Sequence, residues 1–196
     1  MPGNPPLVLA SSSPRRLALL RQIGVEPDEI FDPAVDETPV PRELPREHAS
    51  RLAAAKTAAA AVGRTTACVI LGADTVVACG RRILPKAADA EGALACLRLL
   101  SGRRHRVYTG VALRAPDGRE ALRVVMTVVR FKRLAEDELR SYLASGEWQG
   151  KAGGYAIQGR AEAFILAING SYSNVVGLPL AVTADLLRGL GWRFLP

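Results

Sequence analysis

Apolar residues along the chain follow two patterns, short continuous runs and stripes that repeat every three to four positions. The runs are typical of buried β-strands, and the stripes are typical of amphipathic helices. The runs predict strands over residues 7–10, 29–35, 68–73, 76–78, 82–84, 104–114, 120–131 and 164–168. The stripes predict helices over residues 14–23, 46–62, 89–100, 136–144 and 178–190. The mixture predicts an α/β fold that includes antiparallel strand pairs.

The turn between the first strand and the first helix has the sequence Ser-Ser-Ser-Pro-Arg-Arg over residues 11–16. Ser13 suits the N-cap and Pro14 suits the first helical position, so the free N–H groups of the first turn would point back towards the strand. A helix N-terminus that also carries Arg15 and Arg16 is suited to bind an anion. The alternative interpretation, an ordinary capped helix with solvated arginines, is equally compatible with this segment.

Two acidic residues lie where the predicted strands end. Glu37 lies in the proline-rich loop after the second strand, and Asp74 follows the buried strand 68–73. A carboxylate at the end of a buried strand is costly unless it is paired or bound to a cation. Because strand ends in an α/β sheet face the binding crevice, we expect Glu37 and Asp74 to converge. Two carboxylates suit Mg²⁺ or Mn²⁺, with water and phosphate oxygens as the other ligands.

The chain has 26 Lys and Arg residues against 19 Asp and Glu, a formal net charge of +7, and only four of the basic residues are lysines: Lys56, Lys86, Lys132 and Lys151. The charge favours anionic partners such as nucleotides, although a soluble surface would have the same net charge. Lys56 shares a helical stripe with small and apolar residues, which indicates either a functional buried ammonium or a side chain that snorkels from the core edge. The site would have an excess of positive charge suited to a polyphosphate, contributed by Arg15, Lys56, Lys86 and Lys151.

Several other classes of chemistry are not encoded. The phosphate-binding patterns G-x-x-x-x-G-K-[ST] and G-x-G-x-x-G are absent, as is the G-x-S-x-G pattern of acyl-transfer enzymes. The three cysteines form no C-x-x-C pair, so they predict free thiols and no zinc site. We expect His48 and His105 at the surface or the core edge and assign them no catalytic role. No apolar window approaches eighteen residues and the first six residues do not resemble a signal peptide, so we expect a soluble cytoplasmic protein without a membrane partner.

Six motifs follow one another along the chain: Ser11-x-Ser13-Pro14-Arg15-Arg16, Asp36-Glu37, Gly72-Ala73-Asp74-Thr75, Ser101-Gly102-Arg103, the glycine-rich segment K-A-G-G-Y-A-I-Q-G at 151–159, and the stretch 170–179. In this order they resemble the Maf family over about residues 7–191. The resemblance implies a single domain over residues 1–196, with a mixed, elongated, twisted sheet flanked by helices and two lobes about a central cleft, as in inosine triphosphatases. It also implies a cytoplasmic nucleoside triphosphate pyrophosphatase that requires a divalent cation and removes non-standard or excess nucleotides.

The resemblance assigns roles to individual residues. Asp74 falls on the family's proton acceptor, which activates water, and Glu37 falls on an acid that would hold the metal together with Asp74. We expect the phosphates to contact a set of hydroxyl and basic side chains: Ser13, Arg15, Arg16, Lys56, Lys86 and Lys151. Substrate choice is associated with the positions of Arg15, Thr75 and Gln158.

The combination of S-P-R-R with A-I-Q-G is similar to the dTTP/UTP branch of the family. The 7-methyl-GTP branch tends to carry a bulky residue in place of Arg15 and an acid in place of Gln158. We therefore expect hydrolysis of dTTP and UTP to the monophosphate and pyrophosphate. The alternatives are a 7-methyl-GTP pyrophosphatase and a non-catalytic, nucleotide-binding inhibitor of septum formation.

The remaining expectations concern the partners of the protein and a departure from the family pattern. The resemblance implies a homodimer, and the low aromatic content of 5% argues against binding of single-stranded nucleic acid. The family sequence Gly-Lys-Pro is replaced by Pro85-Lys86-Ala87. Because proline cannot adopt the positive φ open to glycine, this replacement affects the direction in which Lys86 points.

Overall fold

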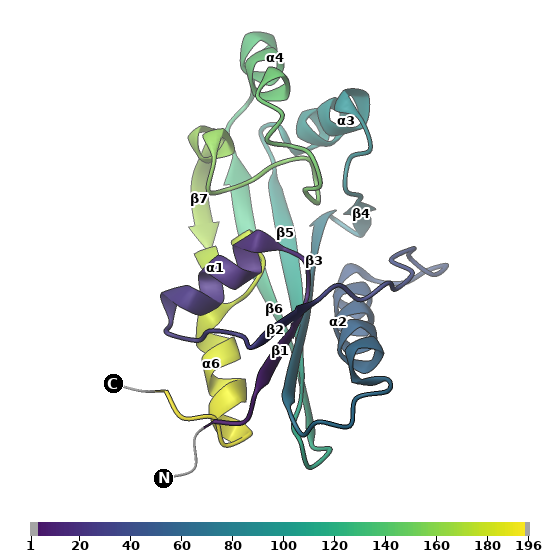
Figure 1. Ribbon diagram of the computed structural model, residues 1–196. Helices are drawn as coiled ribbons and strands as arrows, with labels where there is room; N and C mark the ends of the chain where they lie inside the picture. Colours follow the sequence, from purple (N-terminus) through teal and green to yellow (C-terminus); the bar gives the residue numbers. More distant parts are fainter. Residues whose placement is uncertain (1–3, 195–196) are drawn as a thin grey trace.

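A seven-stranded mixed sheet runs the length of the molecule in the computed structural model, which describes residues 4–194 (Figure 1). In sheet order the strands are β2 (Glu29–Phe31), β1 (Leu7–Ala10), β3 (Val69–Cys79), β5 (Arg104–Arg114), β6 (Glu120–Phe131) and β7 (Ile165–Asn169), and β4 (Arg82–Leu84) pairs with the end of β3. Strand β1 is parallel to β2 and β3, whereas the pairs from β3 to β7 are antiparallel. The expected mixed, elongated sheet is confirmed.

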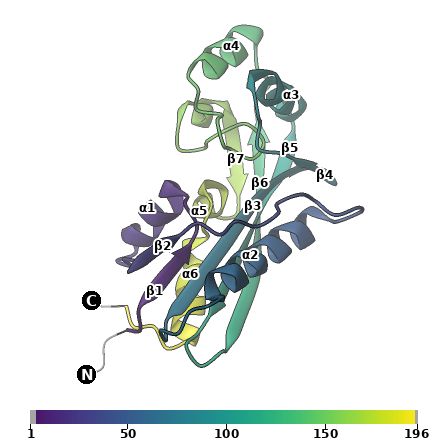
Figure 2. The same ribbon diagram turned by 45° about the vertical axis from the view of Figure 1, so that its right-hand side comes forward.

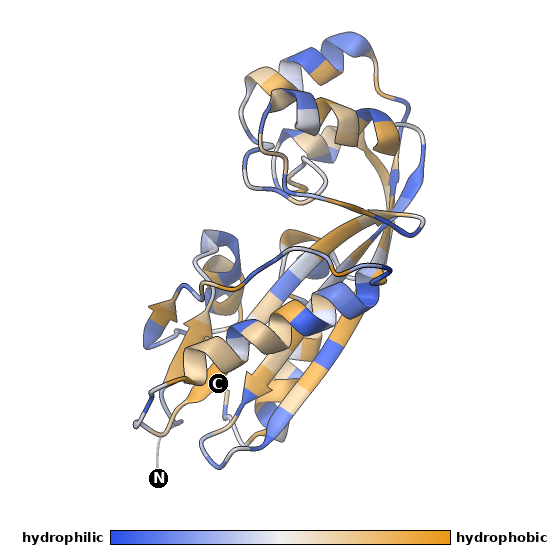
Figure 3. Cartoon of the chain, turned by 90° about the vertical axis from the view of Figure 1, so that its right-hand side faces the viewer, coloured by the Kyte–Doolittle hydropathy of each residue, from blue (hydrophilic) through white to orange (hydrophobic). Residues whose placement is uncertain are grey.

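Helices cover both faces of this sheet. Helices α1 (Pro14–Gln22) and α6 (Leu180–Gly189) lie on one face, and α2 (Pro45–Ala61) lies on the other (Figure 2). Helices α3 (Ala90–Leu100) and α4 (Glu136–Ala144) pack together at the far end of the molecule, and the short α5 (Tyr172–Val176) follows β7. The strands beneath α2 are largely hydrophobic, whereas α2 and the loop before it include hydrophilic stretches (Figure 3). No helix within residues 4–194 combines the length and apolar character needed to cross a membrane.

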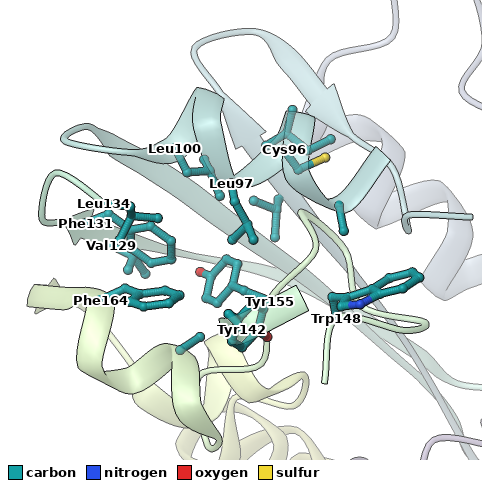
Figure 4. Close-up of a cluster of buried hydrophobic side chains, with 14 of the residues drawn as sticks. Cys96, Leu97, Leu100, Val129, Phe131, Leu134, Tyr142, Trp148, Tyr155 and Phe164 are labelled. Atoms are coloured by element: carbon teal, nitrogen blue, oxygen red, sulfur yellow. The ribbon is translucent and has the colours of Figure 1, made fainter. Parts of the chain in front are cut away.

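The molecule has two main hydrophobic cores, which account for its two lobes. The lower core lies between the sheet, α1 and α6, and includes Leu20 and Leu113. The upper core lies under α3 and α4, and includes Leu97 and Phe131 (Figure 4). Strand β3 contributes Leu71 to the lower core and Val77 to the upper core. The central strands therefore connect the two lobes.

Most predicted elements are present within one or two residues of the expected bounds, but two predictions were wrong. The strand expected over 29–35 ends at Phe31, because Pro33 has no N–H group to donate to a neighbouring strand. The strand expected to end before Asp74 continues, because residues 70–78 all pair with β5. Glu37 therefore lies in an irregular segment and Asp74 lies in the middle of a strand. Helix α5 was not among the predicted elements.

Candidate active site

A cavity of about 450 Å³ lies between segments of the two lobes. Its walls come from the turn before α1, the middle of β3, α2, the segment around Lys86 and the loop over residues 149–158. It is lined by every residue predicted for the site: Ser13, Arg15, Arg16, Glu37, Lys56, Asp74, Thr75, Lys86, Lys151 and Gln158. The structure thus brings the predicted residues together, although they are distributed over most of the chain.

Two lysines and two carboxylates form a chain of ion pairs on one wall of the cavity. The Nζ atom of Lys56 lies 2.5 Å from Oδ1 of Asp74 and 2.6 Å from Oε1 of Glu37. The Nζ atom of Lys86 lies 2.6 Å from Oε2 of Glu37. Lys56 and Asp74 are 6% and 5% exposed. Their burial is tolerable because each charge faces at least one opposite charge.

The two lysines also determine the ionisation of Glu37. Burial by itself would raise the pKa of this carboxyl group, but hydrogen bonds and positive charge from Lys56 and Lys86 lower the pKa to about 2. Glu37 is therefore ionised throughout the neutral pH range. The expected convergence of Glu37 and Asp74 is found, with one lysine bridging them instead of two strand ends meeting.

Close packing of α2 on the sheet places Lys56 over Asp74. A Cβ atom at Gly110 would overlap the backbone carbonyl oxygen of Ala49, and a Cβ atom at Gly72 would overlap α2 as well. Glycine at these two positions lets the helix backbone lie directly on β3 and β5. Because Gly110 is the register partner of Asp74, the closest approach of the helix lies beside the buried carboxylate.

The first turn of α1 forms another wall. Ser13 occupies the N-cap position as predicted, but its side chain makes no capping hydrogen bond. The Arg16 guanidinium is buried, and its Nε donates to the Gly177 carbonyl oxygen at 2.9 Å. The same guanidinium donates to Ser11 Oγ at 2.9 Å and to Thr75 Oγ1 at 3.3 Å. These bonds join α1, β3 and the segment before α6, so Arg16 supports the cavity wall.

Arg15 and Lys151 both line the cavity, and the charge of Arg15 acts on Lys151. Burial and the neighbouring Arg16 lower the pKa of Arg15. Burial and the charge of Arg15 lower the pKa of Lys151, whose ammonium donates to the Gln149 carbonyl oxygen at 2.8 Å. Arg15 makes no side-chain hydrogen bond within the described part of the chain. A bound anion would relieve the repulsion between the two charges.

Gln158 and Thr75, the other residues associated with substrate choice, differ in their surroundings. Gln158 is exposed at the cavity, and its amide makes no hydrogen bond to residues that the structure describes. The Thr75 hydroxyl lies 3.0 Å from Thr109 Oγ1 and 3.4 Å from the Gly177 carbonyl oxygen. Gln158 is thus free to contact a ligand, whereas Thr75 is tied into the wall.

The segment Pro85-Lys86-Ala87 keeps Lys86 in the cavity despite its departure from the family pattern. The Pro85 carbonyl oxygen accepts a hydrogen bond from the Gly153 N–H group at 3.1 Å, and Lys86 forms a β-bridge with Ala152. These contacts hold the segment against the glycine-rich loop. The positive φ of a glycine is therefore not needed to direct Lys86 towards Glu37.

Sequence reasoning missed several residues of the site and misplaced the histidines. The Gly177 carbonyl and Tyr155 line the cavity, and their only sequence signal was their position inside the quoted motifs. His48 and His105 are 4% and 1% exposed, so neither lies at the surface. His48 is buried with a partner that the spacing did not indicate, because its Nδ1 lies 2.8 Å from Glu43 Oε2.

Glu37 and Asp74, the two carboxylates predicted to hold a divalent cation, both line the cavity. Asp74 Oδ2 has no hydrogen-bond partner among the described residues, and the carboxylate faces the cavity. Within residues 4–194, no group of three or more His, Cys, Asp and Glu side chains is arranged to hold a metal. A pair of carboxylates is the protein share of ligands that Mg²⁺ often uses when phosphate oxygens and water supply the rest.

Comparison with known proteins places this arrangement in a family. A family model described as Maf-like protein matches residues 6–190. A protein named dTTP/UTP pyrophosphatase from Caulobacter vibrioides is 59% identical over 193 residues, which cover 98% of this chain and 100% of that protein. One with the same name from Paramagnetospirillum magneticum is 62% identical over 187 residues, covering 95% and 97%.

Among solved structures, a nucleoside-triphosphatase / dITP/XTP pyrophosphatase from Mycobacterium abscessus aligns with a TM-score of 0.41 and 22% identity. The alignment covers 65% of this chain and 75% of that one. The family model and the two relatives, in contrast, span nearly the whole chain, and the residues 6–190 that match the family model include every residue that lines the cavity. On these matches, the chain belongs to the Maf family.

Proposed function

We propose that this chain is a nucleoside triphosphate pyrophosphatase that hydrolyses dTTP and UTP to the monophosphate and pyrophosphate. The observation that carries the proposal is a buried carboxylate, Asp74, in a cavity lined by Arg15, Lys56, Lys86 and Lys151. Such a cavity provides a base for water and positive charge for a triphosphate. The name of the relatives at 59% and 62% identity supports the choice of dTTP and UTP.

In the proposed reaction, Asp74 accepts a proton from a water molecule at its open oxygen, Oδ2. The water oxygen forms a bond to the α-phosphorus, the bond from that phosphorus to the bridging oxygen breaks, and pyrophosphate leaves. Lys56 and Lys86 offset the negative charge on the phosphate oxygens. A divalent cation held by Glu37 and Asp74 would add positive charge at the same oxygens.

The recognition of the substrate is assigned to the opposite wall of the cavity. Arg15 and Lys151 offer positive charge, and Ser13 offers a hydroxyl that is not used as a helix cap. The Gln158 amide offers both a donor and an acceptor to the edge of thymine or uracil. Arg16 and Thr75 would affect substrate recognition indirectly, because they hold the cavity wall in place.

We place the enzyme in the cytoplasm, where it would remove non-standard or excess nucleotides. Nucleoside triphosphates are its proposed partners. The homodimer and the absence of nucleic-acid binding stay predictions.

The test is pyrophosphate release from dTTP, UTP, CTP, the purine triphosphates and 7-methyl-GTP, with Mg²⁺ or Mn²⁺ and with chelator. We expect metal-dependent release from dTTP and UTP. Asp74→Asn should lose roughly a hundredfold or more of this turnover, in line with loss of a general base, and still bind nucleotide. The exposed Asp185→Asn is the matched control and should keep full turnover.

Three results would contradict parts of the proposal. Selective cleavage of 7-methyl-GTP would keep the reaction but overturn the substrate. Full turnover by a folded Asp74→Asn protein would overturn the assignment of the base. Binding without hydrolysis of any nucleotide would favour a non-catalytic role instead.

A further inference from the structure

The loop over residues 150–159 carries Lys151 and Gln158 among the residues that line the cavity, but it contains no helix or strand. Its backbone meets the neighbouring segment at a β-bridge between Ala152 and Lys86, beside the hydrogen bond from the Gly153 N–H group to the Pro85 carbonyl oxygen. A segment of this kind would sample many conformations unless side chains restrain it. The position of Gln158 therefore depends on how the loop is anchored.

The main anchor is Tyr155, whose ring enters the upper core and is surrounded by apolar side chains (Figure 4). Tyr155 is 6% exposed, and its ring meets that of Phe131 edge-on with centroids 4.9 Å apart. Its hydroxyl lies 2.7 Å from Nε2 of His105. The loop is thus held from inside the core by a directional bond as well as by packing.

His105 lies on β5 and is 1% exposed. Its Nδ1 has no hydrogen-bond partner within residues 4–194, so the Tyr155 hydroxyl is the one hydrogen-bond partner of the ring there. Burial lowers the pKa of His105 to about 4, which keeps the ring neutral. A buried histidine with only one of its two ring nitrogens hydrogen-bonded is less favourable for stability than an apolar side chain at the same position. This cost in stability indicates that His105 has a role that offsets it.

A second contact follows immediately along the loop. The Ala156 N–H group donates to the Tyr142 hydroxyl at 3.1 Å, and Ile157 is 1% exposed. The next residue, Gln158, is exposed at the cavity. Residues 155–157 therefore form a buried anchor, and the residue that meets the ligand comes directly after it.

We propose that the hydrogen bond between His105 and Tyr155 is a positioning device for substrate recognition, which holds the loop so that Gln158 and Lys151 face the nucleotide. This inference rests on the proposed function, because it assigns the recognition of the nucleotide to that loop. His105 and Tyr155 are positioning residues, since neither one accepts a proton from the reacting water. Removal of their bond should weaken nucleotide binding and leave the chemical step at Asp74 intact.

The test compares KM and kcat for pyrophosphate release from dTTP and UTP in matched variants. Tyr155→Phe removes only the hydroxyl, and His105→Leu removes the ring nitrogens. Each should raise KM about fivefold to tenfold, with kcat within about twofold of the wild type. His105→Gln, whose amide can reach the position of Nε2, should restore most of the affinity. The double variant should be no weaker than either single variant, because both remove the same bond.

Val129→Ala is the control for simple loss of core packing. Val129 is the register partner of His105 and is 0% exposed, but it makes no contact through a polar side-chain atom. We expect this variant to lower Tm and leave KM unchanged. Equal rises in KM for Val129→Ala and Tyr155→Phe, or unchanged KM in Tyr155→Phe and His105→Leu, would overturn the inference.

Calorimetric binding of dTTP separates this inference from the proposed function. Wild-type protein that binds dTTP without hydrolysing it would contradict the proposed function, and weaker binding by Tyr155→Phe would still support the positioning role. Hydrolysis by the wild type with unchanged dTTP affinity in Tyr155→Phe would reject the positioning role alone.

Discussion

The Lys56 ammonium on α2 lies 2.5 Å from the Asp74 carboxylate in the middle of β3, and both groups are buried. Lys56 also bridges to Glu37, so both carboxylates of the proposed metal site share one lysine as counterion. A cation or a triphosphate that enters the cavity therefore meets charges that are already paired with one another. Binding must rearrange these pairs, and this exchange can be measured.

Removal of Lys56 should destabilise the protein and increase its response to a divalent cation. Lys56→Met leaves Asp74 buried without its lysine partner, and loss of one member of a buried ion pair costs about 3 kcal/mol or more. Because Glu37 and Asp74 would then lack a shared counterion, Mg²⁺ should raise Tm more in the variant than in the wild type. Thermal unfolding with chelator and with Mg²⁺ checks both effects.

Lys132→Met is the control for this experiment, because Lys132 pairs with the partly exposed Glu138 outside the cavity. We expect a change of at most about 1 kcal/mol in its unfolding free energy, as for other partly exposed ion pairs. A response to Mg²⁺ that is equal in all three proteins would argue against a cation site at Glu37 and Asp74.

The close packing of α2 should not tolerate a methyl group at Gly110. Gly110→Ala would force the helix away from β5, with a cost of about 1 to 3 kcal/mol and a displaced Lys56. Activity should fall together with stability. Gly189→Ala on α6 has open space and should stabilise the protein slightly, because alanine favours a helix over glycine. Denaturant unfolding and dTTP turnover of the two variants test the contrast; an active, stable Gly110→Ala protein would contradict it.

His105 should make the protein less stable as the pH falls from about 6.5 to about 4. Its pKa is about 4 in the folded protein against 6.5 for an ordinary histidine, so the unfolded chain takes up the proton first. The full loss from this group is about 3 kcal/mol and is complete near pH 4.

Acidic groups act in a separate, lower pH range. The pKa values of Glu37 and Glu43 are lowered to about 2, so their contribution to stability is present above pH 4.5 and is lost below it. Unfolding free energies at pH 7, 5.5 and 4.5 should therefore fall more steeply for the wild type than for His105→Gln. Parallel curves for the two proteins would be inconsistent with a neutral, buried His105.

A negative charge at residue 158 should change substrate choice. Gln158→Glu replaces the amide donor with a carboxylate, which cannot donate to the oxygen atoms of thymine or uracil. We expect kcat/KM for dTTP and UTP to fall about tenfold or more, and 7-methyl-GTP to gain relative to them. Gln22→Glu, on the exposed end of α1, makes the same change in net charge and should leave the preference unaltered. Equal effects of both variants would point to net charge instead of direct contact.

Local patterns in the sequence determined most of the secondary structure. Strands β5 and β6 have the predicted bounds, because long apolar runs and a Pro-Asp-Gly turn encode a hairpin without help from distant residues. The motifs contain all the predicted residues that line the cavity except Lys56 and Lys86, and the small number of lysines in the chain drew attention to these two and to Lys151. These signals come from residue types and short spacings.

The tertiary structure alone decided how these groups meet. An acid that would normally end a strand lies inside β3 at Asp74, because Lys56, eighteen residues earlier, neutralises it across a helix and sheet interface. Lys86 meets Glu37 across 49 residues, and His105 meets Tyr155 across 50. Such contacts depend on the approach that Gly110 permits and on the shape of two separate cores. No local pattern encodes them, because their energies arise only when distant segments pack together and exclude water.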